Sequence, residues 1–263
     1  MNPSADVAAY ARPRTMVLIP AYKPSFALTT LVRRLLASNA IEGIVVVDDG
    51  SGPQSHPVFD DLGREKRVHV LTHPKNRGKG AALKTGFHFI AQHCPQFSGV
   101  VTADADGQHT YADILKVARE LQKRPRDLVF GARSFDHAVP TRSRFGNLLT
   151  RRVLEIVFGQ KLSDTQTGLR GIPADLVAIC AALRHDGYDY ELEMILTMKK
   201  LGRKIRELSI RTIYIDNNKS SHFKPLLDSL RIYSVFLRFA GSSLLSTIKT
   251  AYIKPGRRAS GNG

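Results

Sequence analysis

The stretch VVTADADGQH, residues 100–109, is the one on which the interpretation of the fold depends. Its first residues, Val100 to Ala103, are typical of a buried strand, and two aspartates, Asp104 and Asp106, follow one residue apart. Along an extended strand, residues i and i+2 face the same way, with Cα atoms about 6.6 Å apart. If strand geometry continues to Asp106, both carboxylates face the same crevice.

A hard divalent cation bound to phosphate oxygens takes one or two carboxylates and keeps water in its other positions. The aspartate pair matches that requirement, Gly107 allows a sharp turn after it, and Gln108 could add a neutral oxygen ligand. The alternative is an exposed acidic turn that ends a strand. A DxD pattern is short and common, so the surrounding elements have to decide between the two.

Outward from this stretch, the chain alternates between strands and helices. Short apolar runs predict strands at 15–20, 43–51, 67–73, 99–107 and 127–133, and helical spacing predicts helices at 25–38, 78–93 and 111–123. After residue 133 we expect a helix at 141–159, a loop at 160–173, a helix at 189–202, a strand or strand pair at 204–215 and helical structure at 225–253. This order predicts an α/β fold with a mostly parallel central sheet flanked by helices.

Ligands of such sheets bind beyond the carboxyl ends of the strands, and the unusual residues of this chain fall there. Four of the expected strands end in such residues, which are Pro20 and Tyr22, Asp48 and Asp49, Asp104 and Asp106, and Arg133. One of Asp48 and Asp49 could accept hydrogen bonds from a base or ribose while the other caps the turn at Gly50. The shared location favours a metal-binding role for Asp104 and Asp106.

The stretch NRGKGAALKTG, residues 76–86, indicates phosphate binding through its glycines and Lys79. It fits neither GxGxxG nor GxxxxGK[ST], so a dinucleotide-binding Rossmann motif or a P-loop is not predicted. A glycine-rich entry to a helix N-terminus still favours an anion nearby.

The composition limits the class of partner. The 263 residues carry a formal charge of +16 and are 43% hydrophobic, so the chain can fill a large core and its surface attracts anions. There is no run of five like charges and no basic motif interleaved with aromatics, so nucleic acid is not the expected partner. Cys94 and Cys180 are far apart and are expected to be reduced thiols, and no signal peptide or transmembrane helix is expected.

Five segments in this order and spacing, VLIPAYKP, VVVDDGSG, NRGKGAAL, TADADGQH and LVFGARSF, resemble the inverting family 2 glycosyltransferases of the GT-A fold. The later segments SDTQTGLRGIP and YDYELEMI are similar to the branch that makes polyprenyl-phosphate hexoses, typified by dolichyl-phosphate mannose and dolichyl-phosphate glucose synthases. The resemblance spans roughly residues 14–235. It divides the chain into a flexible N-terminus at 1–13, a GT-A catalytic domain at 14–220 and a basic amphipathic tail at 221–263.

The resemblance implies a site. Pro20, Tyr22, Asp48 and Asp49 would line the nucleotide pocket, with Lys79 close by. Metal binding, to Mg2+ or Mn2+ at the diphosphate, would fall to Asp104, Asp106 and Gln108, with Asp106 the favoured ligand. The acceptor phosphate would be received by Arg133 and Arg144, with Arg170 a weaker candidate. Many relatives read YNE where this chain has Tyr22-Lys23-Pro24, so any contact made through that glutamate is in doubt here.

The implied reaction moves glucose or mannose from a nucleotide sugar, UDP-glucose or GDP-mannose, to a polyprenyl phosphate for cell-envelope glycosylation. A lipid phosphate is already an anion, so it needs arginines to hold it and no strong general base. The tail mixes apolar residues with Arg231, Arg238 and Lys249, so it either lies on an anionic membrane or packs on the catalytic domain. We expect a cytoplasmic protein, peripheral on the inner face of the membrane, with or without a separate small membrane protein as partner.

Three alternatives remain. A GT-A transferase acting on a sugar hydroxyl would need a base, for which Glu191 and Glu193 are candidates, although either is also plausible as a helix-surface residue. A phosphatase with an aspartate nucleophile resembles the DxDGT pattern, but the order of strands and acidic pair is wrong. A basic module that binds nucleic acid or membrane fits the charge and leaves the acidic strand ends unexplained.

Overall fold

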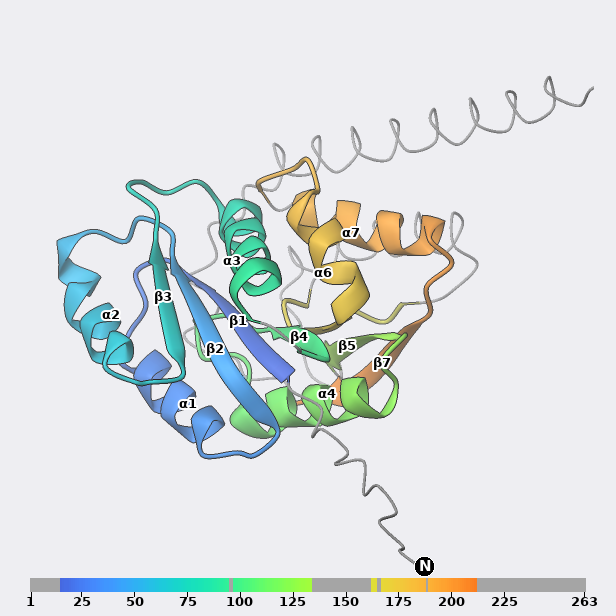
Figure 1. The fold of residues 1–263 in the computed structure, drawn as a ribbon, viewed down its shortest axis with the longest axis horizontal. Helices are drawn as coiled ribbons and strands as arrows, with labels where there is room; N and C mark the ends of the chain where they lie inside the picture. Colours follow the sequence, from blue (N-terminus) through green and yellow to red (C-terminus); the bar gives the residue numbers. More distant parts are fainter. Residues whose placement is uncertain (1–14, 95–96, 134–161, 165–166, 188, 212–263) are drawn as a thin grey trace, which may run out of the picture. The chain divides into compact units, whose positions relative to one another are not determined.

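A sheet of seven strands organises the described residues of the computed structural model, which are 15–94, 97–133, 162–164, 167–187 and 189–211 (Figure 1). The strands are β1 (Thr15–Ala21), β2 (Ile41–Asp48), β3 (Val68–Thr72), β4 (Gly99–Thr102), β5 (Leu128–Arg133), β6 (Arg170–Pro173) and β7 (Ile205–Ile210). The helices are α1 (Ala27–Leu36), the 3-10 turn η1 (Pro53–Ser55), α2 (His56–Gly63), α3 (Lys79–His93), α4 (Tyr111–Lys123), α6 (Ala174–Ala181) and α7 (Asp189–Lys200).

The strands lie in the order β3-β2-β1-β4-β6-β5-β7. The pairs β1–β2, β1–β4, β2–β3 and β5–β7 are parallel, whereas β6 runs antiparallel to both of its neighbours, β4 and β5. The predicted mostly parallel sheet is therefore confirmed. Because β1, β2 and β4 are parallel, their carboxyl ends meet at one edge, where Asp48 ends β2, Asp49 follows it and Asp104 comes shortly after β4.

Helices cover both faces of the sheet (Figure 1). Val17 and Ile19 of β1 belong to the core cluster that includes residues of α1, α2 and α4. Leu18, between them, points to the opposite face and meets Gly86 of α3. A Cβ at position 86 would lie 2.1 Å from Leu18 Cδ1, so α3 can approach the sheet this closely only because residue 86 is glycine.

The most informative difference from the expected elements is β6, which falls in the segment expected to be a loop. Residues 170–173 form a buried four-residue strand inserted between β4 and β5. Four residues containing an arginine, a glycine and a proline carry no alternation that would identify a strand, and pairing on both sides supplies the stabilisation instead. The helices α2 and α6 were likewise not expected.

The expected strand at 99–107 is shorter than predicted. It ends at Thr102, and Ala103 N still donates to Leu18 O at 3.1 Å. The chain then turns, and Gly107 has φ +81°, a conformation that favours glycine. Asp104 and Asp106 therefore lie in a turn and not in a continuing strand.

Several expectations fall on parts of the chain outside the described residues. They are the flexible N-terminus, the helix at 141–159, the boundary at residue 220 and the tail. Among the described residues, no helix is both long enough and apolar enough to cross a membrane. Cys180 is buried and Cys94 half-buried, and both are free thiols, as expected.

Candidate functional site

Asp106 lies at the exposed part of the turn that follows β4. Its Oδ1 accepts a hydrogen bond from Gln108 N at 2.9 Å. Desolvation on the side facing the protein, and next the negative charge of Asp104, raise the pKa of the Asp106 carboxyl. The two carboxylates therefore repel each other, and a cation bound beside them would relieve that repulsion.

Asp104, by contrast, is held on several sides. Its Oδ1 lies 2.7 Å from Lys79 Nζ and its Oδ2 lies 3.2 Å from His109 Nε2. Burial would raise the pKa of Asp104, but the charge of Lys79 and the hydrogen bond with His109 outweigh it and lower the pKa. A Cβ at Gly168 would lie 2.3 Å from Asp104 Oδ2, so the backbone at Gly168 packs directly against this carboxylate. Asp104 is thus fixed, whereas Asp106 is exposed.

Lys79, the first residue of α3, joins Asp104 to a second acid. Its Nζ lies 2.9 Å from Glu191 Oε1, in the first turn of α7, as well as 2.7 Å from Asp104. Burial would lower the pKa of the ammonium, but the charges of Asp104 and Glu191 raise it. The lysine therefore remains charged throughout the physiological pH range.

Arg170 is placed differently from what the sequence led us to expect. It lies in β6 with 1% of its surface exposed and stacks over the Phe130 ring at 4.7 Å. Its Nε donates to Thr167 O at 2.9 Å, its Nη1 donates to Glu191 O at 3.0 Å, and its Nη2 lies 3.8 Å from Glu191 Oε2. These contacts place it beneath α7 as a support for Glu191, because a guanidinium so buried presents little surface to an acceptor phosphate.

The acidic end of β2 is engaged within the protein. Asp48 Oδ1 accepts from Ser51 N at 2.8 Å, which is the turn-capping contact expected for one of the pair. Asp49 is 3% exposed; its Oδ1 accepts from Arg77 N at 2.9 Å and lies 2.7 Å from His73 Nδ1. The anion at the glycine-rich entry to α3 is therefore the Asp49 carboxylate itself, since its Oδ2 accepts from Gly78 N at 2.8 Å.

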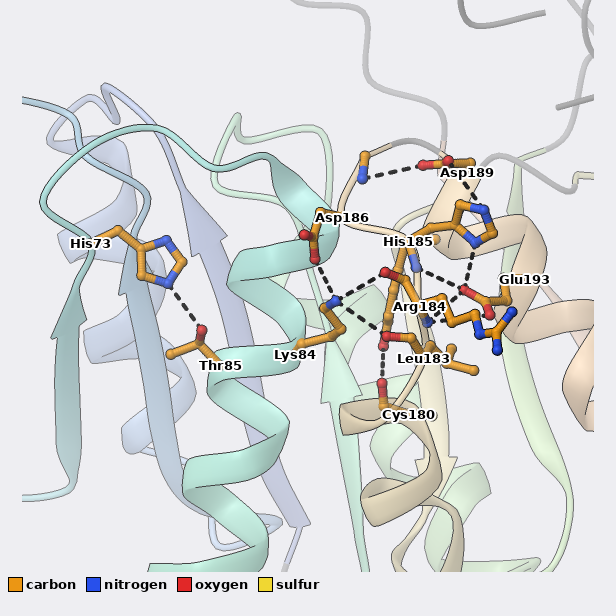
Figure 2. Close-up of polar contacts among 12 residues, drawn as sticks. His73, Lys84, Thr85, Cys180, Leu183, Arg184, His185, Asp186, Asp189 and Glu193 are labelled. Carbon is orange, nitrogen blue, oxygen red and sulfur yellow. Dashed lines mark hydrogen bonds and ion pairs between the residues drawn. The ribbon is translucent and has the colours of Figure 1, made fainter. Parts of the chain in front are cut away.

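The other candidate base, Glu193, lies in α7 and contacts the loop between α6 and α7. Glu193 accepts hydrogen bonds from Arg184 N and His185 N, and its Oε2 lies 2.8 Å from His185 Nδ1 (Figure 2). Burial would raise the pKa of Glu193, but these hydrogen bonds outweigh it and lower the pKa. Glu193 therefore fastens the 183–187 loop to α7.

The loop after β1 borders the same edge of the sheet. Pro20 is the second-last residue of β1, and Tyr22 is 38% exposed beyond it. Lys23 has φ +51°, its Nζ lies 5.2 Å from the centre of the Tyr22 ring, and its N–H donates to Ser51 Oγ at 2.8 Å. Arg133 ends β5, but its side chain and the whole of Arg144 lie outside the described residues.

The donor set suits a divalent cation. Asp104, Asp106 and Gln108 supply carboxylate and amide oxygens, the ligand types that Mg2+ and Mn2+ prefer. Among the described residues, no group of three or more His, Cys, Asp or Glu side chains forms a closed metal cage. Two carboxylates on an open turn fit a cation that takes its remaining ligands from a substrate diphosphate and water.

The sequence did not point to His109 or Gly168. His109 is 5% exposed and orients Asp104, and its position five residues after Asp104 was the available signal. Gly168 is brought to Asp104 only by the pairing of β6 with β4, reinforced by Thr102 Oγ1 donating to Gly168 O at 2.7 Å. No local pattern could have indicated that contact.

Comparison with known proteins is consistent with this geometry. Residues 16–186 match the protein family described as Glycosyl transferase family 2. A UDP-N-acetylglucosamine–dolichyl-phosphate N-acetylglucosaminyltransferase of Methanococcus voltae is 28% identical over 76% of this chain and 86% of its own. An undecaprenyl-phosphate mannosyltransferase of Micrococcus luteus is 26% identical over 75% of this chain and 82% of its own.

Among solved structures, glucosyl-3-phosphoglycerate synthase of Mycobacterium tuberculosis, in complex with Mn2+, UDP and glucosyl-3-phosphoglycerate, has a TM-score of 0.67. The match covers 89% of this chain and 82% of that one at 18% identity, and it shows the fold. The predicted GT-A fold is confirmed.

Proposed function

Because the chain belongs to glycosyl transferase family 2, we propose that it transfers a hexose from a nucleotide sugar to a polyprenyl phosphate, with inversion and with Mg2+ or Mn2+. The observation that carries the proposal is the turn after β4. There, an exposed Asp106 lies beside a fixed Asp104 at the edge where parallel strands end. Glucose or mannose is the proposed sugar.

On the donor side, Asp106 is the main metal ligand, with Gln108 and Asp104 completing the set. A bound divalent cation would neutralise charge that develops on the nucleoside diphosphate as it leaves. Tyr22 and Pro20 border the pocket for the base. Asp48 and Asp49 act by shaping this pocket, because their carboxylates hold the turn at Ser51 and the start of α3.

On the acceptor side, a phosphate monoester needs orientation and no proton removal before attack. The proposed ligands are Arg133, at the carboxyl end of β5, and Arg144. Guanidinium groups bind phosphate oxygens in a fixed, often bidentate geometry, which would hold the acceptor in line with the anomeric carbon.

A hydroxyl acceptor is the second-ranked reading, because it needs a general base. Glu191 is bound by Lys79 and approached by Arg170, and Glu193 is bound by the loop at 184–185. Both acids are thus engaged in holding the protein together. This supports an acceptor that is already an anion.

The lipid part of the proposal is supported by relatives that are named for dolichyl-phosphate and undecaprenyl-phosphate substrates. Such an acceptor places the enzyme at a membrane surface. The proposed location is the cytoplasmic side, where nucleotide sugars are available, and association with a separate small membrane protein stays a prediction.

The deciding experiment is a matrix of donors and acceptors with Mn2+. The donors are UDP-glucose, GDP-mannose and UDP-N-acetylglucosamine, and the acceptors are undecaprenyl phosphate, dolichyl phosphate and a free sugar. The expected product is one lipid-linked sugar, detected by thin-layer chromatography and mass spectrometry. Transfer to the free sugar alone, or no glycolipid with any donor, would contradict the proposed acceptor class.

A further inference from the structure

The glycines on either side of Lys79 serve a contact within the chain. A Cβ at Gly80 would lie 2.6 Å from Tyr190 Cβ and 2.7 Å from the carbonyl carbon of Asp186. A Cβ at Gly78 would lie 2.7 Å from Asp186 O, which also accepts a hydrogen bond from Ala81 N at 3.1 Å. The first turn of α3 therefore packs backbone to backbone against the segment that leads into α7.

Lys79 lies in this contact with an acid on either side. Its ammonium contacts Asp104, in the turn proposed to bind the metal, and Glu191, in the first turn of α7. The Lys79 side chain is 25% exposed and that of Glu191 is 13% exposed, so solvent screens the pair only in part. Removing the Lys79 ammonium would take an ion-pair partner from both carboxylates, leaving Asp104 with His109 and Glu191 with the more distant Arg170.

The 183–187 loop, which leads into α7, is also held on α3 by contacts that do not involve Lys79. Five residues further along the helix, Lys84 Nζ donates to Leu183 O at 3.1 Å and to Arg184 O at 3.4 Å, and it pairs with Asp186 (Figure 2). Glu193 of α7 holds the same loop through its contact with His185 (Figure 2). None of these contacts involves Lys79.

We propose that Lys79 is a positioning residue, which fixes the Asp104 carboxylate relative to the first turn of α7 by pairing with Asp104 and Glu191 at once. This rests on the proposed function and assigns Lys79 a part different from that of a donor-phosphate ligand. In this role Lys79 sets the spacing between the turn that holds the donor and the helix that begins at Asp189.

The experiment compares Lys79→Met with Lys84→Met. The second variant is a matched control, because it removes a lysine from the same helix and keeps the ion pairs of Lys79 with Asp104 and Glu191. A misplaced reacting group costs up to ~100-fold in rate. We therefore expect Lys79→Met to lower kcat at least ~10-fold with UDP or GDP binding, measured by calorimetry, within ~3-fold of wild type. Lys84→Met should keep kcat within ~3-fold.

The double variant Lys79→Met/Glu191→Gln supplies the specific readout, because it removes both members of one ion pair. If Lys79 acts by bridging Asp104 and Glu191, either single change breaks the same bridge. Glu191→Gln alone should then lower kcat as Lys79→Met does, and the double variant should lose no more than Lys79→Met. If Lys79 were instead a ligand of the donor phosphate, the two losses would add.

Three results would overturn the inference. They are a loss of nucleotide affinity of ~10-fold or more in Lys79→Met, an unchanged kcat in that variant, and an equal loss of kcat in Lys84→Met. If wild type transfers no sugar to any polyprenyl phosphate, the proposed function fails separately. The same variants are then compared by nucleotide binding and by hydrolysis of the nucleotide sugar, with the same outcomes deciding.

Discussion

At the scale of single residues, the two aspartates of one short motif, Asp104 and Asp106, differ in how firmly they are held and how exposed they are. Asp104 is fixed by Lys79, His109 and the backbone at Gly168, whereas Asp106 is exposed. A fixed carboxylate sets the geometry, and an exposed one is available to an incoming cation. The sequence favoured Asp106 as the ligand, and the contacts of Asp104 give that preference a physical reason.

Replacing Asp106 by Asn tests the metal assignment. The amide keeps the shape and removes the charge, so we expect turnover with Mn2+ to fall at least ~100-fold. The free energy of unfolding should change by less than ~0.5 kcal/mol, because the side chain is exposed. Transfer assays and urea denaturation measure the two quantities. Turnover near that of wild type would remove Asp106 from the metal site.

Glu193 gives a prediction about pH. Its hydrogen bonds lower its pKa in the folded state, so its contribution to stability is complete above the unfolded value of about 4.3 and is lost as pH falls through the folded value. At neutral pH, Glu193→Gln should lower the free energy of unfolding by about 1–2 kcal/mol. Urea denaturation should show the difference from wild type shrinking below about pH 4. A difference that stays constant down to pH 3 would contradict this.

At the scale of elements, the segment at 76–86 shows why glycines alone do not identify a ligand. Gly78 and Gly80 have no Cβ, so Asp186 and Tyr190 can pack closely against the start of α3. Gly86 allows the same close approach of Leu18 in the central strand β1. The backbone N–H groups of Arg77 and Gly78 are taken by Asp49. A glycine pattern that resembles a phosphate-binding loop is here explained by close packing of α3 on its neighbours.

Replacing Gly86 by Ala tests that close packing. The added Cβ would lie 2.1 Å from a core leucine, so we expect a loss of about 1–3 kcal/mol in the free energy of unfolding, although alanine favours helix. Gly63→Ala in α2 is the control, because a Cβ there meets nothing within 4 Å. Chemical denaturation of both variants measures the effect. Equal stability of the two would show that Leu18 can move aside at little cost.

The elements β6 and β4 mark the limit of what local patterns predict. The buried apolar run of β4 was recognised, but its end was placed five residues too late, because nothing in Ala103 or Asp104 signals the turn that precedes Gly107. β6 was not recognised, because its four residues become a strand only when β4 and β5 pair with it on either side.

At the scale of the whole molecule, the charge of +16 is spread along the chain and is not gathered in one run. A surface of this kind attracts negatively charged partners in general, and the proposed substrates and an anionic membrane surface all carry negative charge. The fold supplies the selectivity, because it collects acidic residues at one edge of the sheet in a chain that is basic elsewhere.

The charge leads to a prediction for the full chain on lipid vesicles. We expect sedimentation with vesicles that contain about 30% phosphatidylglycerol and little with pure phosphatidylcholine. Raising the salt from about 0.05 M to about 0.5 M should release much of the bound protein, because screening weakens the attraction. Equal binding to both kinds of vesicle at both salt concentrations would contradict an electrostatic contact with the membrane.

The sequence by itself determined the α/β class, the mostly parallel sheet, the family resemblance and the strand ends at which acidic residues gather. These follow from hydrophobic periodicity and from short motifs, which are local and therefore legible in the order of residues. Only the tertiary structure decided that Asp49 occupies the start of α3, that Arg170 is buried beneath α7, and that Lys79 joins Asp104 to Glu191. Each of these contacts links residues 21 to 112 positions apart in the chain, and such pairings are set by the packing of the sheet and helices.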